Sequence, residues 1–90
     1  MQCHLSIIEN DLQSDNPCDC VYAIRTCCIQ NVFNDNIIKI MKELKKDKRV
    51  AMMNKVSDFA TAALDILGIE KYNGNNVIII EMIETIIYNK

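Results

Sequence analysis

Apolar side chains recur every three or four residues along most of this chain, which is the spacing of one face of an α-helix. The first well-marked segment begins at Asn16-Pro17, because asparagine caps helices and proline suits the first helical position. Its apolar positions, in a segment that runs to Phe33, are Val21, Ile24, Cys28 and Val32. Asp35 is expected to cap the next helix, whose apolar stripe is Ile37, Ile40, Met41 and Leu44.

The longest helical pattern covers about residues 48–67. Asp47 stands at the expected cap, and Gly68 stands at the position where helices commonly end on glycine. Small residues in its middle allow another helix to approach closely: Ala60, Ala62 and Ala63. Its apolar positions are Met52/Met53, Val56, Phe59/Ala60, Ala63 and Ile66/Leu67. We predict that this helix is the central and most buried one.

The segment that follows is ambiguous. Asn73-Gly74 is typical of a hairpin turn, which would pair residues 68–72 with residues 77–81. The polar positions Glu81, Glu84, Thr85 and Tyr88 instead repeat at helical spacing. We therefore predict a helix over residues 77–88, capped within Asn75-Asn76 and apolar on most of its circumference.

Composition narrows the fold class. The 90 residues are 50% hydrophobic and 24% charged, which argues against disorder, and they include only two glycines and one proline, too few for an all-β domain. The chain is predicted to be all-α, a small bundle of four to five helices around the central helix at about 48–67. A single helical domain covers residues 1–90, in which residues 1–16 are poorly ordered or form one short helix near Leu5–Leu12.

Charge and hydropathy exclude two function classes. The formal charge of −2 argues against a nucleic-acid partner. Five basic residues between Lys42 and Arg49 are interpreted as a solvated helix end, with an acidic partner surface as the alternative. No apolar run approaches the ~20 residues that span a bilayer, and no signal peptide is visible. We therefore expect no membrane insertion and a cytoplasmic location.

Five cysteines require an explanation, and an odd number is a poor disulfide framework. The Cys-x-Cys and Cys-Cys spacings differ from the usual zinc knuckles, so the preferred interpretation is buried thiols that pack as small apolar side chains. A small zinc-binding protein that also uses His4 remains an alternative. The cysteines are Cys3, Cys18, Cys20, Cys27 and Cys28.

Catalytic signals are sparse. Gly68 and Gly74 are the only glycines, so no glycine-rich phosphate loop exists, and no serine has a base nearby in the sequence. The carboxylate pairs Asp58/Asp65 and Glu81/Glu84 are interpreted as solvated helix faces. We expect no enzyme activity and no cofactor.

The candidate functional residues are apolar. The last helix carries more apolar surface than a core of this size readily covers, so it is either packed on both flanks or meets a partner, a second copy included. The candidates for the core or for a partner interface are Phe59, Ala63, Ile66, Ile79, Met82, Ile83 and Ile86.

Two stretches carry a family resemblance. Residues Ser57–Gly68, followed after a loop by Val77–Tyr88 with its Met82-Ile-Glu-Thr85, resemble the C-terminal half of the poxviral Bcl-type helical proteins. Fifteen isoleucines, ten asparagines and eight lysines indicate AT-rich coding, which fits such a virus. The resemblance implies a non-enzymatic antagonist of innate immune (NF-κB or interferon) or apoptotic signalling in the host cytoplasm, with a host signalling protein as partner. Members of the family are longer, with more helices, so the resemblance implies a truncated or minimal version.

A structural helical module is the alternative from another class, either an armadillo/HEAT-like fragment or an assembly subunit. The expected helix pair Asn36–Lys46 and Lys48–Leu67 looks like one repeat of that kind. Stacked repeats need about three copies, and only one is visible.

Overall fold

The computed structural model describes residues 4–51 and 53–88. Within them the chain forms five helices and one short antiparallel hairpin, so the predicted all-α class is confirmed. The strands are β1 (Val50–Ala51) and β2 (Asn54–Lys55). The helices are α1 (His4–Leu12), α2 (Pro17–Gln30), α3 (Asp35–Leu44), α4 (Val56–Ile66) and α5 (Val77–Tyr88).

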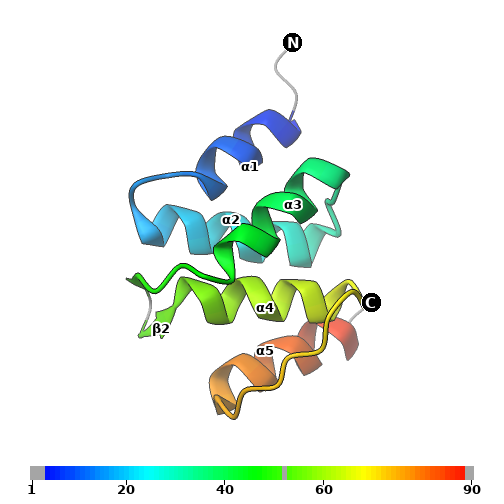
Figure 1. The fold of residues 1–90 in the computed structure, drawn as a ribbon. Coiled ribbons are helices and arrows are strands. Elements are labelled where there is room, and N and C mark those ends of the chain that lie inside the picture. Colours follow the sequence, from blue (N-terminus) through cyan, green and yellow to red (C-terminus); the bar gives the residue numbers. More distant parts are fainter. Residues whose placement is uncertain (1–3, 52, 89–90) are drawn as a thin grey trace.

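Helix α4 lies in the middle of the bundle, as predicted. It packs against α2 and α3 on one side and against α5 on the other (Figure 1). Helix α1 packs on α2, on the opposite side of the bundle from α5. Ala60, Ala62 and Ala63 are fully buried. Their small side chains let the neighbouring helices approach α4 closely, which is why one short helix contacts three others.

Asparagine side chains cap three of the helices. The Oδ1 atoms of Asn16 and Asn76 accept hydrogen bonds from the backbone N–H groups of Cys18 (2.9 Å) and Ile78 (3.0 Å), as predicted. The prediction that Asp35 caps α3 was wrong. Asn34 takes that role and accepts from the Ile37 N–H at 2.7 Å, because the helix begins one residue earlier and Asp35 lies in its first turn.

The predicted start of the central helix was also wrong. Val50–Ala51 and Asn54–Lys55 pair as the strands of the hairpin, in which Ala51 and Asn54 are buried and Val50 and Lys55 are exposed. Met53, expected on the apolar stripe, has a positive φ of 71° and is 90% exposed. Met53 therefore lies in the turn between the two strands, and its place in the three-to-four-residue apolar pattern did not mark a helix.

Backbone carbonyls replace a side-chain cap at the start of α4. Lys55 occupies the cap position without a side-chain hydrogen bond. The N–H of Val56 donates to the Arg49 carbonyl at 2.8 Å, and the N–H of Ser57 donates to the Asp47 carbonyl at 2.9 Å. The segment just before the hairpin thus satisfies the first free N–H groups of α4, which is why the helix begins at residue 56 and not beside Asp47.

The end of α4 and the start of α5 follow the predictions. Gly68 has a φ of +80° and donates its N–H to the Asp65 carbonyl at 2.9 Å, which ends the helix on glycine. Residues 77–88 form a helix instead of pairing with residues 68–72. Tyr72 donates its N–H to the Asp65 carboxylate at 2.8 Å, so Asp65 anchors the loop between the two helices.

Candidate functional site

Five of the seven predicted site residues lie in the core. Phe59, Ala63, Ile66, Ile79 and Ile83 are all buried, and they come from α4 and α5, which pack directly against each other. Met82 and Ile86 are only partly buried. These two residues lie on the flank of α5 that faces α2, so the structure divides the predicted set into a core group and an edge group.

The edge group lines a groove of about 470 Å³ between α2 and α5. Its apolar surface includes Ile29 of α2, which is 63% exposed, and Ile78 of α5, which is 56% exposed. We call this surface the α2–α5 groove. Its lining residues are Arg25, Ile29, Ile78, Glu81, Met82, Thr85 and Ile86.

The register of α5 explains why the groove is apolar. Residues 78, 82 and 86 are spaced four apart and form one stripe along the helix. The neighbouring stripe, with Ile79 and Ile83, packs into the core, about 100° away around the helix. Both stripes of α5 are apolar. Helix α4 covers the stripe with Ile79 and Ile83, whereas the stripe with Ile78 stays at the surface.

The groove continues onto the outer face of α2. A second hollow of about 220 Å³ lies beside it and shares Arg25 and Ile29 with it. Tyr22, which is 67% exposed, borders this hollow, and the Thr26 hydroxyl donates to the Tyr22 carbonyl at 2.9 Å. The two hollows therefore form one continuous surface over residues 22–30 and 78–86.

On its other flank α5 meets the loop that follows α4. A hollow of about 260 Å³ there is lined by Tyr72 from the loop and by Ile80 and Ile87 from the helix. Tyr72 is partly buried against the core. Apolar surface of α5 is therefore uncovered on both flanks, at Ile78 (56% exposed) on the flank that faces α2 and at Ile87 (48% exposed) on the flank that faces the loop.

The cysteines of α2 are mostly part of the core. Cys20, Cys27 and Cys28 are buried and Cys18 is exposed, whereas Cys3 and the side chain of His4 lie outside the described residues. Burial raises the pKa of the Cys20 and Cys27 thiols to about 11. Both thiols are therefore protonated at neutral pH, which agrees with their packing as small apolar side chains. In the described ranges no three His, Cys, Asp or Glu side chains are grouped to hold a metal ion.

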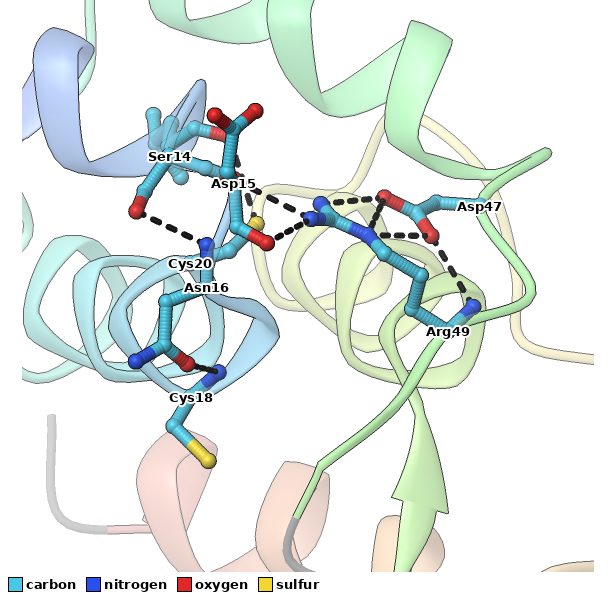
Figure 2. A network of polar contacts seen from close by, with 8 residues as sticks. Ser14, Asp15, Asn16, Cys18, Cys20, Asp47 and Arg49 are labelled. Atoms are coloured by element: carbon cyan, nitrogen blue, oxygen red, sulfur yellow. Dashed lines mark hydrogen bonds and ion pairs between the residues drawn. The ribbon is translucent and has the colours of Figure 1, made fainter.

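A polar network around Arg49 connects two loops that are distant in sequence (Figure 2). Arg49 Nη1 donates to the carbonyls of Ser14 (3.1 Å) and Asp15 (2.9 Å), and its Nη2 donates to Asp47 Oδ2 at 2.7 Å. Nearby, Cys20 Sγ donates to the Leu12 carbonyl at 3.2 Å. The hydrogen bonds from the Arg49 side chain hold the pKa of the Asp47 carboxyl below its usual range.

This network corrects the interpretation of the basic cluster at residues 42–49. Lys42, Lys46 and Lys48 are exposed, as expected of a solvated helix end. Lys45 instead pairs with Glu70, and Arg49 connects loops within the molecule. The sequence offered only the close spacing of Asp47 and Arg49 as a signal, because the carbonyl partners lie about 35 residues earlier.

Comparison with protein-family models, curated proteins and solved structures finds no match to this chain. The resemblance of residues 57–88 to poxviral Bcl-type proteins therefore stays a prediction. Among the helices in the described part of the chain, none is long and apolar enough to cross a membrane. The α2–α5 groove is the surface on which we base a function.

Proposed function

We propose that this chain is a viral, non-enzymatic protein-interaction module that acts in the host cytoplasm. It antagonises innate immune (NF-κB or interferon) or apoptotic signalling, as its resemblance to the Bcl-type family implies. The observation that supports this function best is the α2–α5 groove. Exposed isoleucines from two helices gather there, and contiguous apolar surface of this kind is typical of sites that bind another protein.

The shape of the groove suits a helix of another polypeptide. Two helical walls, α2 and α5, flank an apolar surface that includes Ile29, Ile78 and Met82. An amphipathic helix binds such a groove through side chains spaced three or four residues apart. Arg25 and Glu81 stand at the edges, where charges select the partner and its register more than they add affinity.

The polar side chains of the groove fit binding better than catalysis. They are Arg25, Glu81 and Thr85, and both Glu81 and Thr85 are exposed on the same helix. Nucleophilic catalysis needs a nucleophile beside a base that a third group orients. A charged edge on each wall instead suits the orientation of a bound chain.

The test is a signalling assay in cells that express the chain. We expect the wild type to suppress an NF-κB or interferon reporter, or to reduce induced cell death. Ile29→Glu and Ile78→Glu place a charge in the groove at exposed positions, so they should fold and lose the effect. Ile7→Glu is the matched control, because Ile7 is exposed on α1 and does not line the groove.

Circular dichroism and expression level establish that each variant folds and accumulates equally. Loss of suppression by both groove variants, with the Ile7→Glu variant active, supports the proposal. A wild type that changes neither reporter nor cell survival overturns it, as does full activity of both groove variants.

A further inference from the structure

We infer that a second copy of this chain occupies the α2–α5 groove, so that two copies form a two-fold symmetric dimer. The inference rests on the proposed function, because it takes the same groove as the interaction surface and names its occupant.

Charge placement supports self-recognition. Arg25 lies on the α2 wall and Glu81 lies on the α5 wall, and both side chains are exposed. Neither forms an ion pair with another described residue. When the two-fold axis of the dimer runs along the groove, the α5 helix of one copy faces α2 of the other, so Arg25 of each copy meets Glu81 of the other and the attractive contact occurs twice.

The apolar residues of the groove also suit a contact between α5 of one copy and α2 of the other. The α5 wall presents the stripe of Ile78, Met82 and Ile86, and the α2 wall presents Ile29 with Tyr22 in the adjoining hollow. When α5 of one copy lies against α2 of the other, apolar residues meet apolar residues along both contacts. The surface is therefore self-complementary in apolar pattern as well as in charge.

The size of the surface indicates which class of interface to expect. It covers residues 22–30 of α2 and 78–86 of α5, about two and a half turns of each helix. A standard interface buries about 800 Å² per partner, about a seventh of the 5659 Å² surface of this chain. A contact of two and a half turns lies at the small end of that range, so we expect a reversible dimer with a Kd of about 1–100 μM.

The first experiment measures the mass of the full chain by sedimentation velocity or light scattering over a range of concentrations around this Kd. The wild type is expected to rise from 10.3 kDa towards twice that mass. Arg25→Glu and Glu81→Arg each replace two attractive contacts by two repulsive ones, so each should weaken the dimer at least about tenfold. Lys39→Glu is the control, because Lys39 is exposed on α3 and does not line the groove.

Mixing the two single variants gives the decisive result. The Arg25→Glu copy then offers two acids and the Glu81→Arg copy offers two bases, so a heterodimer has both attractive contacts again. We expect the mixture, and also the doubly reversed Arg25→Glu/Glu81→Arg chain, to dimerise within about threefold of the wild type. Circular dichroism of each variant confirms that its helices are retained.

A chain that is monomeric at all these concentrations overturns the inference. So do single reversals that leave the dimer intact, or a mixture of the two variants that stays monomeric. The signalling assay separates this failure from failure of the proposed function. A monomer whose groove variants lose suppression overturns the second copy alone, whereas a dimer without any effect on signalling overturns the function alone.

Discussion

At the scale of single residues, Arg49 does the most to connect distant parts of the chain. Its guanidinium reaches two carbonyls in the loop before α2, and it pairs with Asp47 in the loop after α3. Its own carbonyl accepts from Val56 at the start of α4. One residue therefore positions the ends of three helices.

The first prediction concerns this side chain. Arg49→Ala leaves the carbonyls of Ser14 and Asp15 without their donor, so the free energy of unfolding should fall by about 1–2 kcal/mol. The partly exposed ion pair with Asp47 adds little to this loss, because solvent screens it. Urea denaturation measures the change. Lys48→Ala is the control at an exposed neighbour, and an equal effect of the two substitutions would contradict the assignment.

The second prediction concerns the pH dependence of stability. The hydrogen bonds from Arg49 lower the pKa of folded Asp47 below its value in the unfolded chain, about 3.9. Its carboxylate therefore stabilises the fold fully above about pH 4, and this contribution disappears as the pH falls through the folded pKa. The stability difference between the wild type and Asp47→Asn should be largest near neutral pH and shrink in acid.

Urea denaturation at a series of pH values from neutral to about pH 2.5 tests this dependence. The difference between the wild type and Lys48→Ala, an exposed position in the same loop, should stay constant over the series. A difference for Asp47→Asn that is as large at the acid end as at neutral pH would contradict the role of the Asp47 carboxylate.

At the scale of elements, α5 has two apolar stripes with different roles. Ile83, which is 7% exposed, packs in the core, whereas Ile78, which is 56% exposed, lines the groove. Ile83→Ala should lower the free energy of unfolding by about 2–4 kcal/mol, and Ile78→Ala should change it by about 0.5 kcal/mol or less. Urea denaturation at a concentration that keeps the chain monomeric measures both. Equal losses would show that the two stripes are equally buried.

Local signals explain which elements were predictable. Asn16-Pro17, Asn76 and Gly68 each act on the backbone within a few residues, so the helix ends that they set were predicted from the sequence. The start of α4 was missed because carbonyls of Asp47 and Arg49 cap it, and the segment that presents them is held by contacts with the loop near Ser14. That cause is tertiary, and no local pattern contains it.

Of the candidate site, only the α5 wall was predicted from the sequence, because the α2 wall depends on tertiary packing. The α5 wall followed from the apolar pattern, which includes Met82 and Ile86. The α2 wall, with Arg25 and Ile29, was not expected, because only the packed bundle determines which helix lies beside α5. Periodicity identifies a residue that faces some neighbour, and tertiary packing decides whether that neighbour is the core, another helix or a partner.

At the scale of the whole molecule, the small thickness of the bundle explains why some apolar side chains are exposed. The Cα positions extend over 40 × 28 × 19 Å, and the shortest dimension is about two helix diameters. In a bundle this thin, α4 is surrounded and the outer helices each keep one face in solvent. A chain that is half hydrophobic has too few neighbours for all of its apolar side chains, and the α2–α5 groove is the result.

The position of α5 at the edge of the bundle also affects how the protein is made. Helix α5 packs chiefly against α4 and follows it in the chain, so the ribosome completes α4 before its cover exists (Figure 1). Until α5 forms, the side of α4 that α5 covers lacks its partner and can contact other nascent chains or chaperones. The same edge position that leaves a groove in the finished protein therefore makes the burial of α4 depend on a helix that is synthesised after it.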